Sequence, residues 1–220
     1  MSEPNIVDWS IHELYAPIQI VPGLVVCLGD VEPPDDGSAV IFLERGESFG
    51  TGAHPATRAV LMELFGFLGW VNETNSHLLE GKRLIDYNCG TGLLALVAKA
   101  AFPQMEVIAV AEKNDHMIAV RNLELNGGTG EILVRSMKSF RGPRQVNKNK
   151  GTFDYIITQA ADPAAGLMSA LLKEEGTLIF GGHNAQVHQV HKNRIGEFFN
   201  VINVDDLLGW PVIRAEKIPQ

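Results

Sequence analysis

Between residues 83 and 199, short apolar runs alternate with segments of helical periodicity, and this alternation restricts the possible fold more than any other feature of the chain. The runs are short and almost continuously apolar, which is typical of strands that a parallel sheet buries on both faces. Strands are expected at 83–87, 107–110, 132–134, 153–158 and 177–180, and helices at 93–101, 115–125, 164–172 and 185–199. This order predicts right-handed crossovers and a doubly wound α/β sheet with helices on both faces.

The two ends of the chain follow a different pattern. Residues 201–204 and 212–215 are β-rich, and the short segment between them ends in Gly209, Trp210 and Pro211. This spacing favours an antiparallel hairpin at the sheet edge, which would give seven mostly parallel strands. Near the N-terminus, 18–28 and 39–43 are also β-rich and are separated by a turn-forming cluster, so they are expected to form a second, short hairpin. Residues 1–45 are therefore interpreted as an N-terminal extension and 46–220 as the main domain.

Composition excludes several classes of protein. A chain of 220 residues with 45% hydrophobic residues can bury a full core, whereas a formal net charge of -8 argues against strong nucleic-acid binding through phosphate neutralisation. The apolar runs are far shorter than the roughly 20 residues needed to span a bilayer, and no signal peptide or disulfide framework is suggested. A cytoplasmic protein without membrane contact is expected, and the oligomeric state is left open.

The segment from Leu84 to Gly92 is the first candidate binding element, because a predicted strand runs there into a glycine-containing turn and then into a helix. Gly90 and Gly92 allow the backbone to approach a ligand, and the helix start supplies free N–H groups. Asp86, near the strand end, is suited to hold the ammonium group of a bound amino acid. The alternative interpretation is an ordinary tight strand-to-helix turn.

The second candidate element is the string from Phe49 to Arg58, with two glycines, two threonines and a histidine. It precedes a Pro-initiated helix predicted over 55–71, which a polar linker over 72–81 follows. The string is typical of a binding loop, and the alternative is a helix cap.

Together these motifs resemble the PrmA-like family of ribosomal-protein methyltransferases, over its catalytic domain. In that family an F-G-T-G-x-H-P-T-T loop covers the cofactor and a D-x-G-x-G-x-G turn holds the methionine part of S-adenosylmethionine. The resemblance implies a Rossmann-like class I methyltransferase domain over 46–220 that N-methylates a protein, either a ribosomal protein or a lysine side chain. It assigns Phe49, Thr51, Gly52, Asp86, Asn88, Cys89, Gly90, Gly92, Glu112 and Ser136 to the cofactor, and Gln159 and His54 to the acceptor pocket.

Four positions depart from the family pattern. Asn88 replaces the first glycine of the turn, and Gln159 replaces an asparagine after the fourth strand. Ala111 stands where the class has the carboxylate that binds the ribose, so Glu112 can substitute only if the strand has already ended. Ser136 or Met137 stands where an acidic residue often lies near the adenine. Two alternatives are therefore retained: a binding or scaffold domain without catalysis, and a methyltransferase of small molecules.

Two further groups of side chains are interpreted without a function. His183, His188 and His191 lack the additional ligands of a zinc site and are expected at the surface of the last helix, so no metal is assigned. The basic stretch 138–150 is expected to be a solvated loop, or alternatively a flap that meets an acidic partner.

Overall fold

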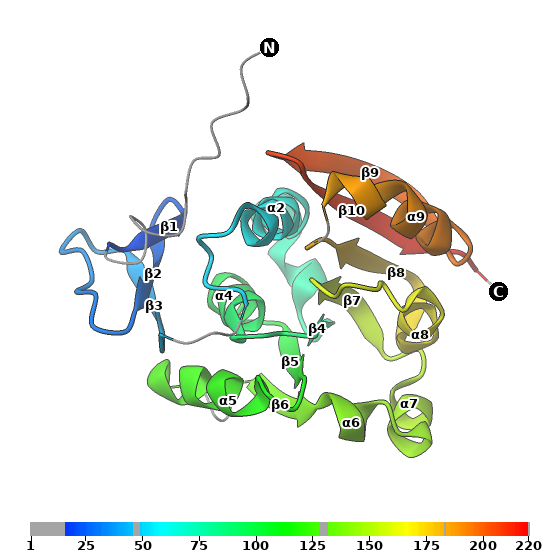
Figure 1. Ribbon diagram of the computed structural model, residues 1–220, viewed down its shortest axis with the longest axis horizontal. Coiled ribbons are helices and arrows are strands. Elements are labelled where there is room, and N and C mark those ends of the chain that lie inside the picture. Colours follow the sequence, from blue (N-terminus) through cyan, green and yellow to red (C-terminus); the bar gives the residue numbers. More distant parts are fainter. Residues whose placement is uncertain (1–15, 46–48, 128–131, 183, 220) are drawn as a thin grey trace, which may run out of the picture.

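The computed structural model describes residues 16–45, 49–127, 132–182 and 184–219 (Figure 1). The strands are β1 (Ile18–Val21), β2 (Leu24–Leu28), β3 (Ala39–Leu43), β4 (Arg83–Tyr87), β5 (Glu106–Ala111), β6 (Ile132–Ser136), β7 (Phe153–Thr158), β8 (Leu172–Phe180), β9 (Phe199–Leu207) and β10 (Trp210–Lys217). The helices are α2 (Pro55–Leu64), α3 (Trp70–Asn75), α4 (Leu93–Ala101), α5 (His116–Leu125), α6 (Met137–Phe140), α7 (Pro143–Asn149), α8 (Ala165–Leu171) and α9 (Ala185–Gly196). A π-helical turn, η2 (Phe65–Gly69), joins α2 to α3, and a 3-10 turn, η3 (Ser76–Leu79), follows α3.

A seven-stranded sheet in the order β6-β5-β4-β7-β8-β10-β9 forms the centre of the protein. The strands β6, β5, β4, β7 and β8 run parallel to one another. The strand β10 is antiparallel to both β8 and β9. This arrangement confirms the predicted α/β fold with its antiparallel hairpin at one edge. The strand order reverses between β4 and β7, which are neighbours in the sheet but not in the sequence.

The alternating side chains of the strands fill two hydrophobic cores, one on each face of the sheet. Leu84 and Ile157 belong to the core that also contains α2 and α4, whereas Ile85 and Ile156 belong to the core that contains α8. Successive residues of a strand point to opposite faces, so an apolar run without alternation must be covered on both sides. The structure thus has the helical layers on both faces that the apolar runs predicted.

The N-terminal strands pair differently from the expected hairpin. The predicted run 18–28 is itself a hairpin of β1 and β2, and β3 then pairs with β2 in parallel. The turn-forming cluster between β2 and β3 is therefore a crossing connection and not a hairpin turn. Asn126, the C-cap residue of α5, donates to the carbonyl oxygen of Phe42 and accepts from its N–H, so this small sheet is tied to the main fold. The division at residue 45 stays a prediction.

Two expected irregular segments are helical. The prediction of a polar linker at 72–81 is wrong over most of that range, because α3 and η3 continue the helical structure to Leu79. The basic stretch is also not a loop, since it contains α7 and the end of α6. Arg141 lies between these two helices and donates to the hydroxyl of Tyr87 at 2.6 Å, a long-range contact that periodicity cannot reveal.

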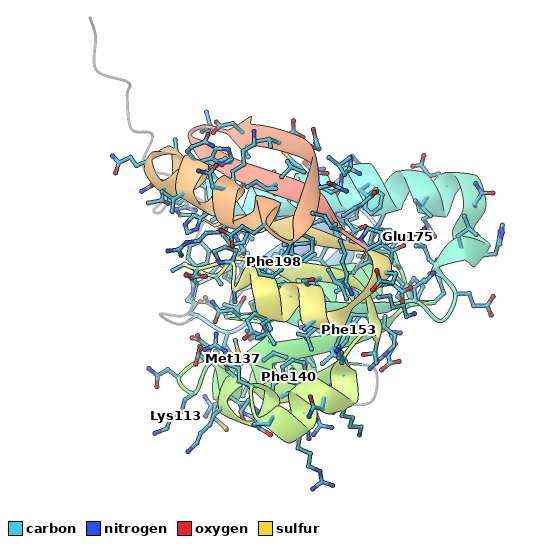
Figure 2. All side chains as sticks on the ribbon, turned by 90° about the vertical axis from the view of Figure 1, so that its right-hand side faces the viewer. Lys113, Met137, Phe140, Phe153, Glu175 and Phe198 are labelled. Carbon is cyan, nitrogen blue, oxygen red and sulfur yellow. The ribbon has the colours of Figure 1, made fainter. Side chains whose placement is uncertain are left out.

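Figure 2 shows the face formed by α7, α8 and α9. Phe198, labelled there, follows α9 and packs against Gly166 of α8. His191 of α9 is buried and its ring meets that of Phe180, which corrects the expectation that it is a surface histidine. His188 is half-buried, and His183 lies outside the described residues. Within the described chain, none of the helices has the length and apolar character that crossing a membrane requires.

Candidate functional site

A hollow of about 280 Å³ lies at the carboxyl ends of β4, β5, β7 and β8. Its described lining consists of Phe49, Asn88, Cys89, Gly90, Leu94, Asp115, Gln159, Ala161 and Gly182. The two candidate binding elements and Gln159, which the resemblance assigned to the acceptor pocket, therefore meet around one space. In open α/β sheets, ligands bind outside the carboxyl ends of the strands, next to the point where the strand order reverses. The volume is near the lower end of the range for small-molecule pockets, about 300–1,000 Å³.

Asp86 lies in β4 and its side chain is completely buried beside Cys89 of the hollow. Its Oδ2 accepts a hydrogen bond from the backbone N–H of Ala95 at 3.1 Å, which satisfies one of the free donors at the start of α4. Oδ1 has no hydrogen-bond partner among the described residues. Burial raises the pKa of Asp86 to about 7, and the bond from Ala95 opposes that shift. Such an orphaned oxygen fits a donor that a ligand brings.

The turn after β4 is built from residues with positive φ. Asn88 has a φ of 68°, Gly90 of 52° and Gly92 of 83°. Asparagine tolerates the left-handed region better than most residues, so the departure from glycine at position 88 leaves the turn intact. A Cβ atom on Gly90 would overlap the carbonyl oxygen of Phe49, so this position requires glycine. Burial raises the pKa of the Cys89 thiol well above its usual value, which makes Cys89 a small packed residue and not a nucleophile.

Thr91 holds the loop ahead of α2 against this turn. Its N–H donates to the carbonyl oxygen of Phe49 at 3.1 Å, and its hydroxyl donates to the carbonyl oxygen of Gly50 at 2.6 Å. Thr51 is half-buried and Gly52 is buried as the loop continues towards the helix. The loop and the turn therefore form one hydrogen-bonded unit, although about 40 residues separate them.

His54 is the N-cap of α2, with Nδ1 accepting a hydrogen bond from the N–H of Ala56 at 3.1 Å. Its ring lies edge-on between those of Phe49 and Trp210, with ring centroids 5.1 and 4.4 Å away. Burial lowers the pKa of His54, so the imidazole is neutral at pH 7. These contacts match the helix-cap interpretation: His54 packs against Phe49 but is not itself among the described residues that line the hollow.

Gln159, directly after β7, reaches the hollow from the opposite side. Its Oε1 and Nε2 both lie 3.4 Å from the hydroxyl of Thr57 in α2. A Cβ atom on Gly182 would come within 3.0 Å of Gln159, so a glycine is needed there. Because Thr57 is itself buried, its hydroxyl is a fixed partner for the carboxamide of Gln159.

The carboxylates after β5 are arranged differently from what the sequence suggested. β5 ends at Ala111, so the condition for Glu112 to replace the ribose carboxylate is met, and Glu112 is exposed. Asp115, which sequence reasoning missed, lines the hollow. Its position as the N-cap residue of α5 was the available signal. Ser136 ends β6, and its side chain accepts a hydrogen bond from the N–H of Ser139 and caps α6.

The sheet order, the turn after β4 and the hollow above it define the Rossmann-like fold of the class I methyltransferases. The structure of a ribosomal protein L11 methylase from Lactobacillus delbrueckii subsp. bulgaricus superimposes with a TM-score of 0.72 at 20% identity, covering 92% of this chain and 99% of that one. At this identity the match is evidence of fold alone.

The chain belongs to the PrmA family, described as ribosomal protein L11 methyltransferase, whose sequence model matches residues 2–218. A protein of that name from Caldanaerobacter subterraneus subsp. tengcongensis is 28% identical over 99% of this chain and 67% of its own length. Another from Ralstonia pickettii is 30% identical over 76% of this chain and 51% of its own length. The chain thus spans between half and two thirds of these relatives. The family is one of S-adenosylmethionine-dependent methyltransferases.

Proposed function

We propose that this chain transfers the methyl group of S-adenosylmethionine to a nitrogen atom of a protein, with ribosomal protein L11 as the first acceptor to test. The observation that carries the proposal is the hollow itself, because residues of both candidate binding elements line it together with Gln159. The names of the relatives support a ribosomal protein as the acceptor.

The residues present suit this cofactor. Asp86 offers a buried carboxylate oxygen that has no partner in the described parts of the chain, and Gly90 adds no side chain to the turn. Asp115 and Glu112 are the carboxylates suited to the ribose hydroxyls, and carboxylates near the hollow also favour a cationic ligand. Phe49 supplies an aromatic side of the hollow. Ser136 lies at the end of β6, next to β5, on the side that the resemblance assigns to the adenine.

When bound, S-adenosylmethionine supplies a methyl group that is activated by its positively charged sulfur. The protein then has to align the acceptor nitrogen and exclude water, so proximity is its main contribution. Gln159, held by Thr57, is suited to orient the acceptor amine through its carboxamide oxygen. A lysine must lose its proton before it attacks, and a desolvating surface such as Phe49 lowers its pKa. His54 packs edge-on against both Phe49 and Trp210 and so helps to hold the ring of Phe49 at the hollow.

Calorimetric titration with S-adenosylmethionine tests the cofactor assignment. Asp115→Asn should weaken binding by about tenfold if Asp115 holds the ribose, whereas Glu112→Gln should do so if Glu112 does. Asp36→Asn, in the exposed connection between β2 and β3, is the control and should bind normally. Absence of heat with the wild-type chain at millimolar cofactor would favour the scaffold alternative. Incubating host proteins with cofactor labelled in the methyl group tests the acceptor, and label confined to small metabolites would exclude a protein acceptor.

A further inference from the structure

A second and larger cavity, of about 690 Å³, opens between α2–η2 and the hairpin of β9 and β10. We refer to it as the hairpin groove. Its described lining consists of Ala59, Met62, Glu63, Gly66, Phe67, Asn203, Asp205, Asp206, Leu207, Val212 and Arg214. None of these residues lines the hollow at the strand ends, so the two cavities are distinct.

The floor of the hairpin groove is apolar and partly open to solvent. Met62 is 63% exposed, although it lies in a helix whose other face is buried in the core. Phe67, Leu207 and Val212 complete the apolar surface. An exposed methionine beside an aromatic ring is typical of surfaces that bind partners of variable shape.

The described lining of the groove carries more negative than positive charge. Glu63, which is buried, pairs with Arg214 Nε at 2.5 Å, and Asn203 donates to Glu63 and to Asp205. Arg214 is the one cation among the described lining residues, and Glu63 neutralises it. Asp205 and Asp206 are exposed and leave the rim with two negative charges. A cationic partner fits this rim, whereas a nucleic acid or a second copy of this chain, at a net charge of -8, would be repelled.

The hairpin groove lies on the helix and the strand that carry His54 and Trp210 at their starts, and His54 also packs against Phe49 of the hollow. His54 caps the start of α2 and contacts Trp210 at the start of β10, whereas Glu63 and Arg214 lie further along the same helix and strand. Glu63 lies nine residues after His54 along the helix, and Arg214 lies four residues after Trp210 along the strand. Both separations correspond to about 13 Å. A fully extended peptide covers this distance with about four residues.

We infer that the hairpin groove binds a cationic, partly apolar segment of the acceptor protein that flanks the nitrogen that is methylated. This inference rests on the proposed function, because only a protein acceptor has such a flanking segment. Apolar side chains of the segment pack on Met62 and Phe67, and its lysine or arginine side chains pair with Asp205 and Asp206. Recognition of the acceptor is then separated from the chemistry at Gln159.

Fluorescence anisotropy of the full chain with a labelled ten-residue peptide of alternating lysine and valine tests this inference. The double variant Asp205→Asn and Asp206→Asn should weaken binding by about tenfold, because two exposed ion pairs are lost. Asp35→Asn with Asp36→Asn is a matched control: it removes an adjacent exposed pair from the β2–β3 connection, and Asp36, like Asp206, accepts a hydrogen bond from a nearby backbone N–H. The control should bind within about twofold of wild type. Met62→Lys should abolish binding, and thermal unfolding checks that each variant is folded.

Three outcomes would overturn the inference: equal weakening by both double variants, equally tight binding of a peptide with glutamate in place of lysine, or no binding of the lysine peptide. Calorimetric titration with S-adenosylmethionine separates these outcomes from a failure of the proposed function. A chain that binds the cofactor but not the peptide contradicts the hairpin groove alone. A chain that binds neither contradicts both.

Discussion

Phe49 and Gly90 are in direct backbone contact, with the carbonyl oxygen of Phe49 occupying the space that a side chain on residue 90 would need. The same oxygen accepts the hydrogen bond from Thr91 that joins the loop to the turn. The geometry of the hollow therefore depends on residue 90 having no Cβ atom.

Gly90→Ala should displace the loop and weaken the binding of S-adenosylmethionine by at least about tenfold. The new Cβ atom overlaps a backbone atom, which cannot move away as a flexible side chain would, and the positive φ adds strain of about 1–2 kcal/mol. Gly81→Ala is the control, because Gly81 has a φ of 67° but nothing within 4 Å of the added Cβ atom. Calorimetry and urea unfolding measure the two effects. Equal cofactor affinity in both variants would show that the contact with Phe49 is irrelevant to binding.

The stability of the protein should depend on pH through Asp86. Burial raises its pKa from 3.8 to about 7, so the folded state binds this proton more tightly than the unfolded chain does. The resulting stabilisation is complete below pH 3.8 and is lost as the pH rises to about 7, by an amount on the order of 4 kcal/mol at most. Asp86→Asn keeps an oxygen for the N–H of Ala95 but does not titrate. The free energy of unfolding of the wild type should fall relative to that of this variant across this range in urea titrations, and a constant difference would contradict the prediction.

Asn88→Gly should retain stability and tighten cofactor binding, since it removes a side chain from the lining of the hollow and keeps a φ of 68° accessible. Asn88→Ala removes most of the same side chain but places alanine in the left-handed region, at a cost of about 1–2 kcal/mol. Urea unfolding together with calorimetry distinguishes the two variants. Weaker binding by Asn88→Gly would mean that the amide of Asn88 itself contacts the cofactor.

Removing the charge of Glu63 should destabilise the fold strongly. Glu63→Gln leaves the largely buried Arg214 without its counter-ion, and breaking one side of such a pair costs about 3–5 kcal/mol. Asp30→Asn breaks the exposed pair with Arg45 and should cost about 1 kcal/mol or less. Chemical denaturation of both variants gives the comparison. Similar small losses in both would show that the pair behaves as a surface ion pair.

The order of strands and helices was predictable because each element carries its own local pattern. The continuous apolar run at β5 and the helical spacing of apolar residues at α2 appear in the sequence without any knowledge of neighbours. The candidate site was predictable in part, since a glycine turn and a loop string are local motifs. Phe49, Asn88, Cys89, Gly90 and Gln159 line one hollow, whereas the other residues that the sequence assigned to the site are not among its described lining. Asp115 was missed because an aspartate is common at the start of a helix.

Other features depended on contacts between distant segments. The parallel pairing of β3 with β2, the anchoring of Gln159 by Thr57 and the pair of Glu63 with Arg214, 151 residues apart, follow from how the layers pack. Local periodicity records which face of an element is buried, but not which neighbour covers it. The sequence by itself therefore determined the sheet and several residues at the carboxyl ends of its strands. The tertiary structure decided that Oδ1 of Asp86 has no partner among the described residues, and where the hairpin groove opens, because those properties depend on distances that no single segment contains.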